Sequence, residues 1–253
     1  MYNSPFFITE PLWNNEFSHA ERLALWSKGG IYIPPMKEWT VDDLEIWTEI
    51  AFEEVEHIGA ESRKSGMVDN TLISCVGLKH FISTNKEGIP IYIFDNHNHA
   101  LFFWYRHSKQ FEHSEVAKPF KVIHIDQHSD IKPNINSFDA KRITPNEMFG
   151  FTNYACNVGN FITSALDSWL IDECIQIRTE AKLHQIQNLA FRTYNYILDI
   201  DVDFREGKTE QEIESDFTII RKLMKEVCLV TIATSPYFMD QNQAIALIKQ
   251  LCI

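Results

Sequence analysis

The chain has 253 residues, of which 45% are hydrophobic, and its 35 acidic and 23 basic side chains give a formal net charge of -12. A chain of this length and composition can bury a large core, and it predicts a single α/β domain spanning residues 1–253. The acidic balance argues against a nucleic-acid partner, because binding phosphates requires a basic face, and it suits a cationic substrate.

No targeting or membrane segment is visible in the sequence. The first residues, MYNSPFFITEPLWNNEF, lack the basic and apolar regions of a signal peptide, and no apolar run approaches the roughly 20 residues of a membrane-spanning helix. The cysteines form no CxxC pair, as is typical of reduced thiols in a cytosol. These features predict a cytoplasmic protein with no membrane partner, and they leave open whether it forms a homo-oligomer.

The first predicted element is a helix that follows Thr40. Thr40 and Asp43 stand in the positions of a capping box, and Gly59 would end the helix. Apolar residues recur at helical spacing on one face, at Leu44, Trp47, Ala51, Val55 and Ile58. The remainder of the N-terminal portion, residues 1–85, has no assigned role.

Four short apolar runs then predict strands. They lie near residues 90–95, 120–126, 194–201 and 228–235, and their continuous hydrophobicity is typical of strands buried on both faces. Helical spacing appears in residues 160–171 and 209–227, the second with a capping box at Thr209 and Glu212. The pattern predicts a three-layer α/β fold, with a mainly parallel sheet between helices and sites outside the carboxyl ends of the strands.

Three of these strands lead into side chains that bind metal ions. The residues are His97, His99, Asp126, His128, Asp130, Asp199, Asp201 and Asp203. At strand period, residues two apart face the same side, and clustered carboxylates need a cation to offset their repulsion. Oxygen and imidazole donors without thiolate favour Mn, Fe, Co or Zn, and carboxylate-rich pairs suit Mn. We interpret His124 as a core or supporting residue, and the other histidines as packing or surface residues.

A family resemblance appears at this point. HIDQHSD followed by LDIDVDF resembles the ureohydrolase (arginase/agmatinase) pattern, in which Asp-x-His-x-Asp, a later Asp-x-Asp and an upstream His hold two Mn²⁺ ions. With FDNHNHALF, NVGNFI and TIATSP, residues 91–236 are most similar to the peptide arginases, a divergent branch that converts arginine side chains of ribosomally made peptides into ornithine. The resemblance implies an arginase/deacetylase-like fold, two Mn²⁺ ions, urea release and an arginine-containing precursor peptide as partner.

The resemblance also implies roles for individual residues. The implied metal ligands are His97, Asp126, His128, Asp130, Asp199 and Asp201. Asp126 and Asp199 would bridge both ions, with His97 and Asp130 completing one ion and His128 and Asp201 the other. Asp130 would also move the proton during catalysis, with His99 as a helper, and Asp203 receives no role.

The sequence departs from the arginase pattern where substrate would bind. Asn157 or Asn160 stands where free arginases have a proton-shuttling histidine, and Thr234 and Ser235 stand where a carboxylate would hold the guanidinium. These four residues are the predicted substrate-binding residues, and with Asn153 they suit neutral amides. No lysine or arginine near the motifs matches a free α-carboxylate, which favours arginine within a peptide. Asp240 could supply a charge, but with Gln243 it fits better as a helix cap.

Other functions remain open. DIDVDF also resembles the nucleophile loop of haloacid-dehalogenase-type phosphatases, although such a loop normally opens its domain. A metal-dependent deacetylase would hold one zinc ion, a small-molecule ureohydrolase would share the superfold, and a metal-stabilised module could bind basic peptides without catalysis. Aromatic residues could contact a peptide or form the core; they are Phe6, Phe7, Trp13, Phe17, Trp26 and the stretch LFFWYRH.

Overall fold

The structure is a computed structural model that describes residues 1–8, 31–52, 54–60, 73–111, 119–186, 195–205 and 207–252. The aromatic residues Trp13, Phe17 and Trp26, which we considered for peptide contacts, lie outside the described residues, as do His19 and His113.

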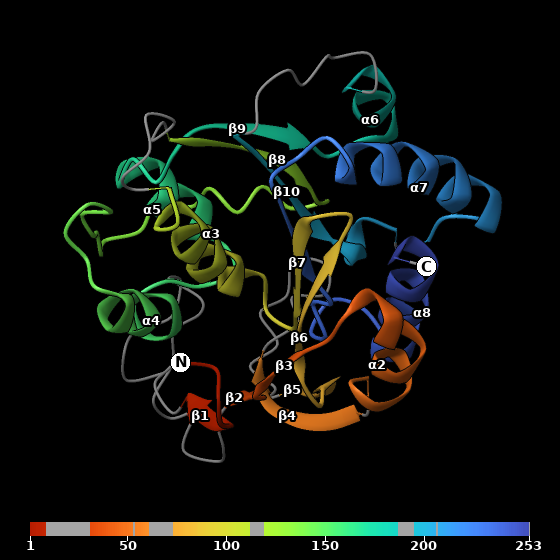
Figure 1. Ribbon diagram of the computed structural model, residues 1–253, viewed down its shortest axis with the longest axis horizontal. Coiled ribbons are helices and arrows are strands. Elements are labelled where there is room, and N and C mark those ends of the chain that lie inside the picture. The colour runs from red at the N-terminus through yellow and green to blue at the C-terminus, as the bar shows by residue number, and fades with distance from the viewer. Residues whose placement is uncertain are drawn as a thin grey trace.

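Within the described residues, a seven-stranded sheet in the order β3-β6-β7-β11-β10-β8-β9 forms the centre of the protein (Figure 1). The five strands from β7 to β9 in this order are parallel, and β6 runs antiparallel to β7. The strands are β3 (Met36–Glu38), β6 (Phe81–Lys86), β7 (Ile89–Phe94), β8 (Phe120–Ile125), β9 (Ile171–Ile177), β10 (Tyr196–Asp201) and β11 (Leu229–Ala233). The predicted mainly parallel α/β sheet is confirmed.

Helices cover both faces of this sheet, which gives three layers (Figure 1). One face carries α3 (Ala100–Ser108), α4 (Pro145–Tyr154) and α5 (Phe161–Asp167). The other carries α2 (Leu44–Ile50), α6 (Glu180–Ile186), α7 (Glu210–Met224) and α8 (Gln241–Cys252). Three short 3-10 helices are η1 (Val41–Asp43), η2 (His97–His99) and η3 (Val202–Arg205). Across the described ranges, no helix combines the length and apolar character that crossing a bilayer requires.

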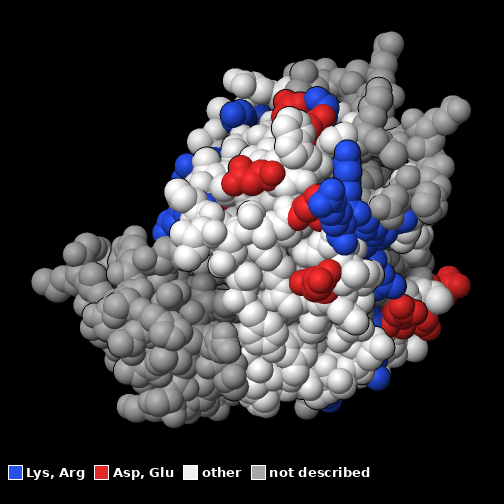
Figure 2. All heavy atoms as spheres, turned by 90° about the vertical axis from the view of Figure 1, so that its left-hand side faces the viewer, with Lys and Arg blue, Asp and Glu red and all other residues white. Residues whose placement is uncertain are grey.

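The excess of acidic side chains is not gathered on the side that carries α4 and α5. Figure 2 shows acidic and basic side chains next to one another there, on a described surface that is largely uncharged. The described part of this face therefore offers no broad acidic surface.

The helix predicted from residue 41 to Gly59 is wrong in its second half. It ends at Ile50, and residues 54–60 form β4 (Glu54–Ala60), which pairs with β5 (Ile73–Leu78). Pairing with a distant strand outweighs the local helical spacing, which cannot reveal such a partner. The Thr40–Asp43 contact does form, since the Asp43 carboxylate accepts from Thr40 N at 3.1 Å.

The other predicted elements are confirmed. The four predicted strands correspond to β7, β8, β10 and β11, and the two predicted helices contain α5 and α7. The capping box of Thr209 and Glu212 is present, and Asp240 caps α8 by accepting from Gln243 N at 3.0 Å. The stretch LFFWYRH forms most of α3, where the residues from Leu101 to Tyr105 are buried. Those side chains therefore belong to the core, and Phe6 pairs through β1 (Phe6–Ile8) with β2 (Ile31–Ile33).

The order of the strands creates a switch point beside β8. The chain leaves β8 through α4 and α5 on one face of the sheet, whereas it leaves β10 through α7 on the other face. Because β8 and β10 are neighbours, their carboxyl ends lie at this switch point, which is where open α/β sheets bind ligands.

Candidate metal centre

The carboxyl ends of β7, β8 and β10 bring the predicted metal-binding residues together. His97 lies in η2, just after β7, and Asp126 and Asp130 follow β8. Asp201 ends β10, and Asp203 lies in the η3 turn that follows it. Apart from the half-exposed His128, the carboxylates and imidazoles of this cluster are buried.

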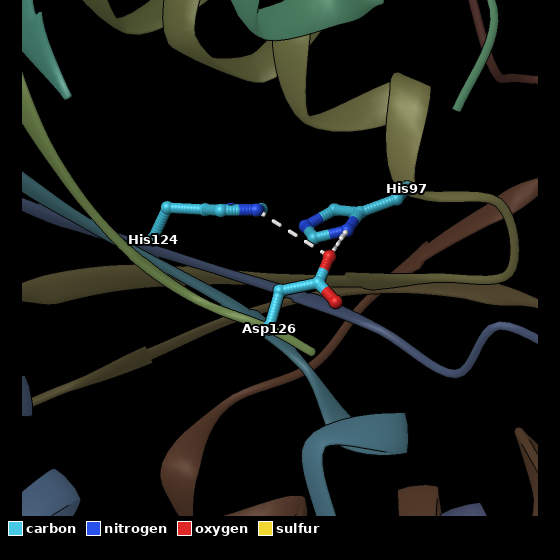
Figure 3. A group of neighbouring side chains, drawn as sticks. All are labelled: His97, His124 and Asp126. Carbon is cyan, nitrogen blue, oxygen red and sulfur yellow. Dashed lines mark ion pairs between the residues drawn. The ribbon is translucent and has the colours of Figure 1, made fainter. Parts of the chain in front are cut away.

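One group of ligand atoms surrounds His97 Nδ1. Asp126 Oδ2 and Asp201 Oδ2 each lie 3.2 Å from this nitrogen, and Asp130 Oδ2 lies 3.4 Å from it. Neither His97 Nδ1 nor Asp126 Oδ2 makes a hydrogen bond, although both are buried (Figure 3). Ligand atoms bound 2.0–2.2 Å from one ion lie about 3 Å apart. The group therefore fits the coordination sphere of a divalent cation.

A second group surrounds His128 Nδ1. This nitrogen lies 3.1 Å from Asp203 Oδ2 and 3.3 Å from Asp126 Oδ1, and neither oxygen of the buried Asp203 carboxylate makes a hydrogen bond. Asp126 thus presents Oδ1 to this group and Oδ2 to the group at His97. Two adjacent positions sharing one carboxylate suit a pair of metal ions. The sequence gave Asp203 no role, yet its side chain belongs to the second group.

Asp199, predicted to bridge the ions, lies on the opposite side of the His97 ring from Asp126. Its Oδ2 accepts from His97 Nε2 and from His124 Nδ1, each at 2.8 Å, and its Oδ1 accepts from Thr231 at 2.6 Å. Although burial opposes ionisation, the two histidines lower the pKa of Asp199 to about 2. Its carboxylate is therefore charged and already occupied by three donors.

The cluster carries more negative charge than its own imidazoles can offset. Five carboxylates (Asp126, Asp130, Asp199, Asp201 and Asp203) face three imidazoles (His97, His124 and His128), so two negative charges remain even if every ring is protonated. Within the described part of the chain, no lysine or arginine forms an ion pair with these carboxylates. Buried charges require partners, and either protons on the carboxylates or bound cations can supply them here.

Protons occupy parts of the site when no metal is bound. Asp126 and Asp203 raise the pKa of His128 to about 10. Burial opposes charge on His97, but Asp199 and the other carboxylates raise its pKa well above the usual value. Burial and the charge of Asp201 raise the pKa of Asp203 to about 7. A metal ion has to displace these protons, because its ligands bind in the deprotonated form.

We therefore expect the affinity for Mn²⁺ to rise with pH. Below its raised pKa His128 holds a proton, so between about pH 6 and about pH 9 each displaced proton should strengthen binding by roughly tenfold per pH unit. Isothermal titration calorimetry in buffers of different ionisation enthalpy would count the protons released. Binding heats that do not depend on the buffer, with an affinity unchanged by pH, would contradict the expectation.

Two residues of the site have a left-handed backbone. Asp130 has a φ of 52° and Ser235 a φ of 47°, a conformation that residues other than glycine adopt rarely and at a cost of about 1–3 kcal/mol. Ser235 Oγ donates to Asp201 Oδ2, and Ser235 N donates to the carbonyl of Asp95. The strained backbone at Asp130 thus orients the Asp130 carboxylate itself. The strained backbone at Ser235 positions the hydroxyl that orients the Asp201 carboxylate.

The predicted substrate-binding residues make hydrogen bonds within the protein. Asn160 Oδ1 accepts from Asn157 N at 2.8 Å, and Thr234 Oγ1 donates to Asp95 Oδ1 at 3.1 Å. Both asparagines belong to the turn that precedes α5. Their role in substrate binding stays a prediction, whereas the hydroxyl of Ser235 contacts the candidate metal centre itself.

His99, predicted as a catalytic helper, lies apart from this group. Its ring is buried against Phe81 and Phe94, and its Nδ1 shares a hydrogen bond of 2.8 Å with the hydroxyl of Tyr2. Tyr2 lies 97 residues away in the sequence, so no local pattern could have revealed this contact. The position of His99 gives it a supporting place in the core beneath η2.

The open side of the site lies around His128 and has an apolar rim. The Phe238 ring centre lies 5.1 Å from that of His128, and Phe238 is 43% exposed. Ile131, directly after Asp130, is 49% exposed. Lys132 also lies here, since its N donates to the carbonyl of Gly159, near the predicted substrate-binding asparagines. No motif in the sequence had pointed to these rim residues.

Comparison with solved structures finds a similarity to the arginase from Bacillus caldovelox, in its native structure at pH 5.6. The sequences are 14% identical, the TM-score is 0.38, and the similarity covers 64% of this chain and 68% of the arginase chain. No protein-family model matches the chain. No curated protein sequence matches it either.

Proposed function

We propose that the protein hydrolyses arginine side chains in a ribosomally made precursor peptide, giving ornithine and urea, with two Mn²⁺ ions as cofactors. The observation that carries this proposal is the cluster of buried carboxylates and imidazoles at the ends of β7, β8 and β10, which Asp126 divides into two ion positions. Its residues lie in the HIDQHSD and LDIDVDF segments that resemble the ureohydrolase pattern.

The ligand set follows the geometry. His97, Asp130 and Asp201 would hold one ion, and His128 and Asp203 the other, with Asp126 shared between them. Asp203 thus takes the place beside His128 that the resemblance gave to Asp201, and Asp201 joins His97 instead. Asp199 is not used as a bridge, because its oxygens already accept three hydrogen bonds. Paired divalent ions lower the pKa of water by many units and so supply hydroxide near neutral pH.

The reaction consumes one water per arginine. Hydroxide adds to the guanidinium carbon, the bond from this carbon to the side-chain nitrogen breaks, and the nitrogen leaves as the ornithine amine. The carboxylate of Asp130, nearly buried and ionisable, would receive the proton of the attacking water and deliver it to the departing nitrogen. The role of His99 as a helper stays a prediction, and its Nδ1 shares a hydrogen bond with the Tyr2 hydroxyl.

The surroundings of the site favour a peptide substrate. The excess negative charge of the cluster would attract a guanidinium, while the exposed side chains of Phe238 and Ile131 would offer apolar contact to residues flanking the arginine. A free amino acid would need charged partners for its own ammonium and carboxylate groups. Lys132 and Arg178 are cations near this side of the site, since the Arg178 guanidinium donates to the carbonyl of Gln127. The contribution of Lys132 to binding such a carboxylate can be tested by substitution.

We expect arginine within a peptide of about ten residues to be converted much faster than free arginine, because a peptide avoids the cost of placing unpaired terminal charges at the rim. Urea release and the loss of one CN₂H₂ unit per arginine, measured by mass spectrometry with Mn²⁺-loaded protein, give kcat/KM for each substrate. Lys132→Met is the matched variant, and it should leave the peptide reaction unchanged. Equal kcat/KM for the peptide and for free arginine would favour a small-molecule ureohydrolase. So would a decrease in kcat/KM of Lys132→Met that is seen with free arginine and not with the peptide.

The same assay separates the remaining alternatives. A deacetylase would release acetate from acetyl-lysine peptides, and a phosphatase would release phosphate, both without urea. A metal-stabilised binding module would retain an arginine peptide, and the peptide mass would not change. Any of these results in place of urea release would overturn the proposed reaction.

A further inference from the structure

His124 is a buried histidine whose second nitrogen has no hydrogen-bond partner. Its side chain is 0% exposed, its Nδ1 donates to Asp199 Oδ2 at 2.8 Å, and its Nε2 makes no hydrogen bond. A neutral ring protonated at Nδ1 presents a lone pair at Nε2. Leaving such a group unsatisfied in the interior costs free energy, so the nitrogen requires a partner.

In the candidate metal centre this nitrogen faces a carboxylate oxygen. His124 Nε2 lies 3.4 Å from Asp126 Oδ2, which also lacks a hydrogen bond (Figure 3). Because Asp199 occupies Nδ1, Nε2 is the nitrogen of His124 that faces the centre, and a cation bound there would also lie within reach of Asp126 Oδ2. His97 Nδ1 faces the same oxygen at 3.2 Å, and the ligand atoms of all three residues lie within 4.8 Å of one another.

His97 and His124 are held in the same way. Each donates one ring N–H to Asp199 Oδ2 at 2.8 Å and points its other nitrogen at Asp126. Figure 3 shows the two rings approaching the Asp126 oxygen from η2 and from β8. A carboxylate that accepts the outer N–H of a histidine fixes the tautomer and orientation that metal binding needs. Asp199 makes this contact with both rings.

Asp199 is itself fixed by the sheet. Asp199 on β10 pairs in register with His124 on β8 and with Thr231 on β11. Thr231 Oγ1 donates to Asp199 Oδ1 and accepts from Trp104 Nε1 at 3.1 Å. Asp199, His124 and Thr231 lie two residues before the level of Asp201 along the strands. Because the sheet fixes their positions, the imidazoles that Asp199 binds have little freedom to rotate.

The geometry points to His124 Nε2 as a further ligand of the ion held by His97, with Asp199 as the positioning residue for both imidazoles. This position then has two imidazole ligands, whereas the position at His128 has one. Imidazole suits Zn²⁺, Co²⁺ and Ni²⁺ better than the harder ions that prefer oxygen. The two positions should therefore differ in metal preference, the one at His97 and His124 favouring the softer ions.

This inference rests on the proposed metal centre and is independent of the reaction catalysed there. Its first test needs no substitution: the number of imidazoles coordinated to metal in the fully loaded protein, from X-ray absorption of the Co²⁺ form and from pulsed EPR with ¹⁵N-histidine. We expect three imidazoles for two ions. Two imidazoles would overturn the inference.

The second test is His124→Phe, which removes both nitrogens and keeps a ring. Titration with Co²⁺ should show one position weakened by at least about 100-fold, because changes in residues that only support ligands already cost 10- to 100-fold. His107→Phe is the matched control, since His107 is also buried but contacts Phe111 and Phe120 outside the centre. It should bind both ions as the unaltered protein does.

Asp199→Asn completes the test, since it keeps the shape but loses the charge that orients both rings. It should weaken the same position while the number of coordinated imidazoles stays at three. An unchanged Co²⁺ affinity in His124→Phe would overturn the inference even if urea were released. Three imidazoles without urea release would instead leave the inference standing and refute the proposed function.

Discussion

Asp126→Ala should remove most of both metal ions and abolish hydrolysis. Asp126 offers Oδ1 to the group at His128 and Oδ2 to the group at His97, so its loss takes a ligand from each position. Because removing a residue that only supports a ligand costs 10- to 100-fold, losing the shared ligand should lower turnover by more than about 100-fold. Metal analysis after purification with Mn²⁺ should show about two ions per chain in the unaltered protein and less than one in the variant.

Thermal unfolding provides a second measurement of the same change. Added Mn²⁺ should raise the Tm of the unaltered protein, because an ion that binds only the folded state stabilises it by mass action, and it should barely affect Asp126→Ala. Asp172→Ala removes an exposed carboxylate from β9 and is the matched control. Two tightly bound ions in Asp126→Ala would refute the shared-ligand arrangement.

The sheet was predictable because its strands carry their own signal. The runs that became β7, β8, β10 and β11 are continuously apolar, and polar residues follow directly where these strands end. The carboxyl ends of parallel strands lie at one edge of the sheet, so the clustering of the predicted metal ligands at that edge could be predicted from the sequence alone. The helix predicted through residue 59 failed for the opposite reason, since β4 exists only through its pairing with β5.

Which of the three aspartates in DIDVDF face the candidate metal centre could not be determined from the sequence. All three share one face at strand period, and the depth of each depends on the register with β8. That register places Asp199 opposite His124, so Asp199 lies behind the site and Asp203 lies beside His128. The same register turns His124, interpreted as a core or supporting residue, toward Asp126.

Backbone strain was likewise invisible in the sequence. Nothing in HIDQHSD indicates that Asp130 has a φ of 52°, since aspartate tolerates this conformation without requiring it. The strained residue nevertheless determines where its carboxylate points, which is toward His97 Nδ1 at 3.4 Å. The role proposed for Asp130 thus requires both its charge and a backbone conformation that few other residues adopt.

Asp130→Asn separates these two requirements. Asparagine adopts the left-handed conformation as readily as aspartate does and has the same shape, but its amide cannot take up the proton of the attacking water. We expect kcat to fall by about 10²- to 10⁴-fold, the usual contribution of a general acid-base residue, with KM changing far less. Steady-state kinetics of urea release from an arginine peptide would measure both constants.

The pH profile shows whether proton transfer is the part that is lost. Burial raises the pKa of Asp130, and a base has to be deprotonated, so activity of the unaltered protein should increase as pH rises through that pKa. In Asp130→Asn the activity should not show this increase with pH. Asp130→Gly relieves the φ strain but also removes the carboxylate, so its turnover should be as slow as that of Asp130→Asn. Near-normal turnover in Asp130→Asn with both ions bound would show that another group moves the proton, because the geometry and the metal content would then be intact while the proposed acceptor was absent.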